Sequence, residues 1–199
     1  MELIVISNPN AVANESNIIN QLFKSGLKYF HIRKPDSNIN VIRKLLNEID
    51  IIYHNRIALH QFHELKSEFE IKKLHFTEIA RSNVSLEQFK NLADKGFTLS
   101  TSIHDVSMLP ELSIFNYVFY GPVFDSLSKP GYLSNLSDNF KIHKTNTKPK
   151  VMALGGVQLS NLLKIKAMGF HGAAVLGTIW NEPWKAVERF KELNRNLPV

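Results

Sequence analysis

Residues able to bind anions follow several of the apolar runs in this 199-residue sequence. Arginine and lysine can neutralise an anion, serine hydroxyls can donate to it, and glycine lets it approach the backbone closely. Where such residues gather at one edge of a barrel or sheet, they are typical of a phosphate pocket. The candidates, in chain order, are Arg33, Lys34, Ser126, Ser128, Lys129, Gly155, Gly156 and Gly177.

One of the segments that hold these candidates is long and polar. Residues 121–148 hold Ser126, Ser128 and Lys129, and their pattern indicates at most one weak helix. Loops of this length in a compact domain are often functional. Two hydroxyls and an ammonium could bind a diphosphate and neutralise the charge that develops on a leaving group.

Histidines form a second group of candidates. His31, His60, His75 and His104 lie at or near the ends of successive apolar runs, and His60 and His63 form an H-x-x-H pair. Zinc or non-haem iron is one interpretation, but no carboxylate accompanies the pair at a recognisable spacing. The pattern favours hydrogen-bonded histidines at the mouth of a pocket, with acid–base use of one of them as the alternative.

The elements that must position these residues alternate strictly between strand and helix. Such alternation over about 200 residues predicts either a (β/α)8 barrel or an open doubly wound sheet, and eight units favour a compact parallel barrel formed by residues 1–199 as one domain. The expected strands are residues 3–7, 28–33, 56–60, 71–76, 97–102, 115–120, 150–154 and 172–176. The expected helices are residues 14–25, 38–49, 62–69, 85–94, 106–112, 160–168 and 183–194.

Composition narrows the classes of partner. The formal net charge is +6, no cysteine is present, and no apolar stretch approaches the ~20 residues that span a bilayer. No basic block interleaved with aromatic residues indicates nucleic-acid binding. We therefore expect a cytoplasmic protein that binds acidic small molecules and neither nucleic acid nor membrane. Exposed apolar positions on the helices are compatible with a homodimer.

Several segments together carry a family resemblance over nearly the whole chain. The chain resembles the thiamin phosphate synthase superfamily, which includes the related thiazole tautomerases. The most specific segment, residues 120–129, is similar to the family pattern Gly-Pro-x-Phe-x-Thr-x-Thr-Lys with both threonines replaced by serine. The other segments are His31-Ile32-Arg33-Lys34, Leu74-His75-Phe76, Ser102-Ile103-His104, Ala153-Leu154-Gly155-Gly156-Val157 and Ala173-Ala174-Val175.

The resemblance implies a (β/α)8 barrel that joins hydroxymethylpyrimidine diphosphate to thiazole phosphate and releases diphosphate with Mg²⁺. It implies that Arg33, Ser126, Ser128 and Lys129 hold the diphosphate. It implies that Gly155, Gly156 and Gly177 hold the thiazole phosphate. It also places Ser102 near the reacting pyrimidine, so the catalytic candidates are Ser102, Lys129 and His104.

The sequence departs from the family pattern at the expected metal ligands. Where the synthase pattern has Asn-Asp after the third strand, this chain has His60-Gln61, and the place of the second aspartate falls near Glu78. Gln61 and Glu78 are therefore the candidate Mg²⁺ ligands in place of two aspartates. The catalytic histidine of the tautomerase branch is replaced by Pro122. A tautomerase using another histidine, and a non-catalytic binder of a thiamin-pathway phosphate, remain the alternative functions.

Overall fold

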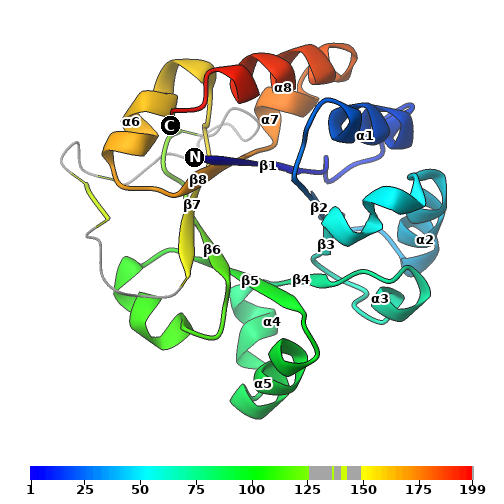
Figure 1. Ribbon diagram of the computed structural model, residues 1–199, viewed down its shortest axis with the longest axis vertical. Coiled ribbons are helices and arrows are strands. Elements are labelled where there is room, and N and C mark those ends of the chain that lie inside the picture. The colour runs from blue at the N-terminus through cyan, green and yellow to red at the C-terminus, as the bar shows by residue number, and fades with distance from the viewer. Residues whose placement is uncertain (126–135, 137–139, 143–148, 199) are drawn as a thin grey trace.

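Eight parallel strands close into a barrel, in chain order, as the sequence predicts (Figure 1). The computed structural model describes residues 1–125, 136, 140–142 and 149–198. Each strand pairs with the next, and β8 returns to pair with β1, where Leu3 lies opposite Ala173. The strands are β1 Glu2–Ile6, β2 Tyr29–Ile32, β3 Ile57–Leu59, β4 Lys73–Phe76, β5 Thr98–Ile103, β6 Tyr117–Tyr120, β7 Lys150–Leu154 and β8 Gly172–Val175.

Helices surround the barrel and cover its outer face (Figure 1). The α-helices are α1 Glu15–Lys24, α2 Ile39–Glu48, α3 Leu65–Glu68, α4 Glu78–Ser82, α5 Leu86–Asp94, α6 Leu162–Ala167, α7 Gly177–Trp180 and α8 Ala186–Arg195. The 3₁₀ turns are η1 Ile51–Arg56, η2 Val106–Leu112, η3 Leu159–Asn161 and η4 Pro183–Lys185.

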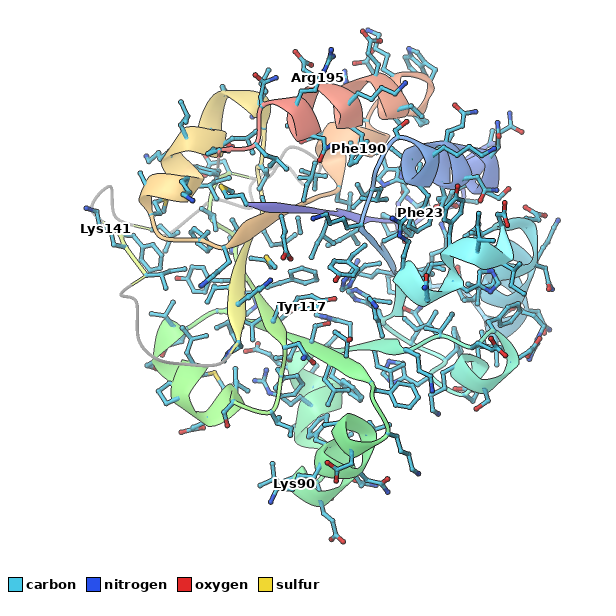
Figure 2. All side chains as sticks on the ribbon, viewed as in Figure 1. Phe23, Lys90, Tyr117, Lys141, Phe190 and Arg195 are labelled. Carbon is cyan, nitrogen blue, oxygen red and sulfur yellow. The ribbon has the colours of Figure 1, made fainter. Side chains whose placement is uncertain are left out.

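Two separate packing layers follow from the alternation of side chains along each strand. Residues such as Leu3 and Val5 of β1 belong to the large core between strands and helices. Their neighbours Ile4 and Ile6 belong to a second cluster together with Tyr117, Phe119, Met152 and Ala174. This second cluster fills the interior of the barrel, and Figure 2 shows Tyr117 inside the ring of strands.

The structure differs from the predicted elements mainly in short turns. Residues 106–112 form 3₁₀ turns rather than an α-helix, since Pro110 lies inside the segment and cannot donate a backbone hydrogen bond. Helix α4 is five residues long and is not among the helices predicted from the sequence. The only feature that marks it is an N-cap, in which the Thr77 hydroxyl accepts from the backbone N–H of Ala80. Ser85 and Gln88 form a capping box at the start of α5. None of the described helices has the length and apolar character that a membrane span requires.

Candidate functional site

A cavity of about 680 Å³ opens where the strands end. Barrels of this type place their ligand sites at the carboxyl ends of the strands. Predicted site residues that line the cavity are Arg33, Glu78, Ser102, His104, Gly155, Gly156 and Gly177. The structure therefore brings together residues from the ends of β2, β4, β5, β7 and β8, which are separated by up to 144 positions (177 − 33) in the sequence.

The glycines after β7 support a close approach between two loops. Gly156 has a φ of +60°, and a Cβ there would lie 2.4 Å from the carbonyl oxygen of Asp125. The backbone N–H groups of Val123 and Phe124 donate to the carbonyls of Leu154 (2.9 Å) and Gly155 (3.2 Å). Glycine is thus required here to seat the start of the loop after β6 against the end of β7, a role that the phosphate argument from sequence did not include.

Arg33 and Lys34 separate in the structure, although they are adjacent in the sequence. Arg33 lines the cavity, and its backbone is fixed by the buried Ser7 hydroxyl, which accepts from Arg33 N–H (2.8 Å) and donates to Arg33 C=O (3.0 Å). The Lys34 ammonium donates to the carbonyls of Asn8 and Asn10, both at 2.9 Å, and pairs with Glu15. The buried Lys34 side chain therefore connects the loop after β1 to Glu15. It does not line the cavity, although the sequence led us to expect that it would.

The two candidate metal ligands do not face each other. The Gln61 side-chain amide donates to the carbonyl of Lys34 and accepts from its N–H, so both ends of the amide contact one backbone unit. Glu78 lines the cavity, where its carboxylate oxygens lie 3.8 Å from an Arg81 nitrogen and 3.8 Å from Nε2 of His104. Among the described residues that line the cavity, Glu78 supplies the only carboxylate. Gln61 therefore does not join Glu78 in holding Mg²⁺, an ion that proteins commonly bind through one or two carboxylates together with water and substrate phosphates.

Three of the histidines lie inside the barrel rather than at its mouth. His31, His60 and His75, from the ends of β2, β3 and β4, are buried, and nitrogens of all three lie within 4.8 Å of one another. The rings of His60 and His75 stack with centroids 3.9 Å apart. The expectation of hydrogen-bonded histidines is met, but their predicted place at the mouth is wrong, because these strands end with the imidazoles pointing inward. His104 alone of the four lies at the mouth.

Burial keeps these imidazoles neutral. It lowers the pKa of His31 from 6.5 to about 3, with a smaller contribution from the positive charge of Lys73. Burial, followed by the neighbouring imidazoles, holds the pKa values of His60 and His75 well below 6.5. A neutral imidazole has one N–H donor and one acceptor nitrogen, so each ring must find one partner of each kind.

The H-x-x-H pair does not form a site with two converging ligands. Nε2 of His63 lies 3.0 Å from the carbonyl of Leu59 and 3.2 Å from that of His75, while its ring packs edge-on against Phe76 of the outer core. His60 points into the barrel instead. The pair is thus divided between the two faces of the strand layer.

Some predicted site residues lie outside the described part of the chain, and some residues seen near the site were not predicted from the sequence. Ser126, Ser128 and Lys129 lie outside the described residues, so their predicted contact with diphosphate stays a prediction. Conversely, Tyr117 and Ser100 were not singled out, yet both contact the buried histidines. Their signal was present, since a tyrosine and a serine at inward positions of apolar strands need buried polar partners.

The fold and the cavity define a (β/α)8 barrel whose candidate ligand site lies at the carboxyl ends of the strands. The sequence profile of thiamine monophosphate synthase matches residues 3–179, and the chain belongs to that family. A solved structure of thiamine phosphate pyrophosphorylase from Bacteroides thetaiotaomicron is 30% identical, with a TM-score of 0.75 over 98% of this chain and 97% of that one.

Curated relatives are more distant. A thiamine-phosphate synthase from Leuconostoc citreum (strain KM20) is 25% identical over 183 residues, which are 84% of each chain. One from Psychrobacter sp. (strain PRwf-1) is 28% identical over 125 residues, and this match spans only 58% of either protein. The family resemblance inferred from the sequence is therefore confirmed, together with the barrel.

Proposed function

We propose that this protein is a transferase that joins hydroxymethylpyrimidine diphosphate to thiazole phosphate and releases diphosphate. The observation that carries the proposal is the convergence of an arginine, a serine and two glycine-rich strand ends on one cavity of a thiamine monophosphate synthase barrel. Arginine suits the diphosphate, and the glycine backbone that lines the cavity after β7 and β8 suits the phosphate of the second substrate.

The reaction requires little covalent chemistry from the protein. The bond between the pyrimidine methylene carbon and the diphosphate oxygen breaks, and diphosphate leaves with the electron pair. The ring nitrogen of thiazole phosphate then forms a bond to that carbon. Arg33, with Ser126, Ser128 and Lys129 as predicted partners, would stabilise the charge that develops on the leaving group. The chain thus acts by positioning two anions and by neutralising one of them as it departs.

Magnesium has no step in this proposal. The family resemblance predicts Mg²⁺, but Gln61 contacts the Lys34 backbone and Glu78 faces two basic side chains. Because Gln61 and Glu78 do not converge on one position, we assign Mg²⁺ no ligand from the described part of the chain. We expect the departure of diphosphate to be assisted chiefly by cationic side chains.

A turnover assay tests the proposed function. Purified protein is mixed with both substrates, with and without Mg²⁺, and thiamin phosphate is followed by thiochrome fluorescence. Lys129→Ala and Arg33→Ala should each lose activity, whereas Arg43→Ala, which removes an exposed ion pair with Glu68 on the outer surface, serves as the matched control.

Three outcomes separate the functions. Turnover that is lost in Lys129→Ala supports the transferase. Absence of turnover, with thiazole phosphate still raising the melting temperature, overturns the transferase and leaves a non-catalytic binder. Conversion of the thiazole precursor to its aromatic tautomer would instead identify an isomerase that uses a histidine other than the one replaced by Pro122.

A further inference from the structure

Side chains, and not the sheet, hold the chain just beyond the end of β2. The last backbone hydrogen bonds that β2 receives from β1 and β3 end on the carbonyls of His31 (2.8 Å) and Ile32 (3.1 Å). The next two residues are Arg33 and Lys34, whose N–H and C=O groups therefore need partners from outside the sheet. Those partners come from the residues that follow the two flanking strands.

Two polar side chains supply these partners. The Ser7 hydroxyl, directly after β1, accepts from Arg33 N–H (2.8 Å) and donates to Arg33 C=O (3.0 Å). The Gln61 side-chain amide, shortly after β3, accepts from Lys34 N–H (3.4 Å) and donates to Lys34 C=O. Every polar backbone group of Arg33 and Lys34 is thus bound by a side chain from a neighbouring strand end.

The Arg33 guanidinium is the group whose position depends on these contacts. Arg33 lines the cavity, and none of the described residues forms a hydrogen bond or an ion pair with its guanidinium. The position of this cation is therefore set by the backbone from which the side chain extends. Holding that backbone from both sides keeps the guanidinium near the cavity before a ligand arrives, which lowers the entropy cost of binding an anion there.

The backbone next to Gln61 is strained. Phe62 has a φ of +54°, in the left-handed region that a bulky residue rarely adopts. Such strain persists only where the surrounding structure holds it, and it gathers at functional sites. The turn at Phe62 separates Gln61, which contacts the end of β2, from His63, whose ring packs in the outer core. The fold thus retains a costly turn together with the two contacts that Gln61 makes.

We propose that Gln61 and Ser7 are positioning residues that hold Arg33 in place for the diphosphate group of a ligand. Gln61 stands where the family pattern has an aspartate, and it acts on the anion through Arg33 and not through a metal ion. That the anion is a diphosphate rests on the proposed function, whereas the fixed backbone of Arg33 follows from the contacts alone.

Calorimetry with inorganic diphosphate, without Mg²⁺, tests the role of Gln61. Gln61→Met removes both contacts to Lys34, while the Lys34 carbonyl keeps a bond from Ser37 N–H (3.0 Å), so the segment should still fold. We expect this variant to bind diphosphate roughly fivefold more weakly, the effect of losing about one hydrogen bond. Gln88→Met is the matched control, because it removes a glutamine that accepts from Ser85 N–H (2.8 Å) away from the cavity.

A double-mutant cycle shows whether Gln61 acts through the arginine. In the Arg33→Ala background, Gln61→Met should leave the remaining affinity for diphosphate unchanged, because the group that it positions is gone. An equal loss in both backgrounds would overturn the proposal, since Gln61 would then act on the anion without Arg33. Unchanged affinity in the single variant Gln61→Met would overturn it as well.

A second ligand separates positioning from a general loosening of the fold. Gln61→Met and Ser7→Ala should weaken diphosphate binding and leave the affinity for thiazole phosphate unchanged. Ser7→Thr, which keeps the hydroxyl, should retain more affinity for diphosphate than Ser7→Ala. A loss shared equally by both ligands would show a merely structural role and would contradict the proposal.

Turnover distinguishes this proposal from the proposed function. Diphosphate binding that depends on Gln61, in a protein without turnover, would uphold the positioning role and overturn the transferase. Turnover with the same KM for the diphosphate substrate in Gln61→Met would uphold the transferase and overturn the positioning role. A protein that binds no inorganic diphosphate would also overturn the positioning role.

Discussion

The ammonium of Lys34 lies 2.8 Å from a carboxylate oxygen of Glu15, and both side chains are more than nine-tenths buried. The same ammonium donates to the carbonyls of Asn8 and Asn10, so its three hydrogens are all used. Burial raises the pKa of Glu15, and the hydrogen bond and charge of Lys34 oppose that rise. This pair connects the loop after β1 to the end of β2, directly below a cavity wall.

Removing Lys34 should therefore act on folding rather than on phosphate binding. Lys34→Met leaves a buried carboxylate and two carbonyls without their donor, which costs about 3–5 kcal/mol of the free energy of unfolding. Urea denaturation measures this loss, and Lys34→Met with Glu15→Gln should recover part of it. A stable single variant with weakened phosphate binding would instead show that Lys34 contacts the ligand.

Gly156 should be intolerant of any side chain. Gly156→Ala combines a φ of +60° with a contact of 2.4 Å to the carbonyl oxygen of Asp125, so the two loops must separate. We expect reduced stability and a loss of thiazole phosphate affinity, measured by thermal shift and calorimetry. Gly96→Ala is the matched control, since Gly96 has a φ of +78° but no atom within 4 Å of its Cβ position. Only a modest strain of roughly 1 kcal/mol is expected there.

Arg33 should hold an anion whether or not turnover occurs. Arg33→Ala should weaken the binding of inorganic diphosphate at least tenfold, because a charge-assisted contact contributes about 1.5–3 kcal/mol. The Ser7 contacts of Arg33 involve only backbone atoms of Arg33, so the fold should be retained. Calorimetry with diphosphate at two salt concentrations provides the measurement. Unchanged affinity in Arg33→Ala would place the diphosphate elsewhere.

The buried imidazoles should make the protein acid-labile. Because the folded pKa of His31 is about 3 while the unfolded value is near 6.5, the unfolded chain binds the proton first. Stability is therefore complete above pH 6.5 and falls as the pH drops from 6.5 towards 3, by on the order of 1 kcal/mol per pH unit for each such imidazole. His60 and His75 share the direction of the pKa shift.

Urea titrations at several pH values measure this slope. His75→Asn removes one of the imidazoles whose pKa is lowered by burial, so its slope between pH 6.5 and 4.5 should be smaller than that of the unmodified protein. The contributions of other titrating groups, such as His63 and Glu15, are the same in both proteins and cancel in the comparison. Identical slopes would mean that the ring of His75 is charged or solvated in the folded state.

The barrel could be predicted from the sequence because its signals are local and repeated. All eight strands were expected near their observed positions. The cavity-lining residues were reachable for the same reason: a barrel gathers the ends of its strands, so Arg33, Ser102 and Gly177 converge without further information. Cytoplasmic location and dimerisation stay predictions.

Contacts between distant side chains could not be predicted in this way. Whether Lys34 enters the cavity depends on the path of the chain from Asn8 to Glu15, which no local pattern specifies. Whether His60 or His63 points inward depends on where β3 ends, and a shift of one residue exchanges their faces. Which of the two histidines points inward is therefore determined by the assembled barrel and not by the local sequence.

The barrel interior is divided chemically. On the side of β7, β8 and β1 it is filled by Ile4, Ile6, Met152 and Ala174, whereas from β2 to β6 it contains imidazoles, hydroxyls and a phenol. Replacing a buried polar network with well-packed apolar residues is often neutral or stabilising. A search for thermostable variants would therefore favour substitutions in the polar half first.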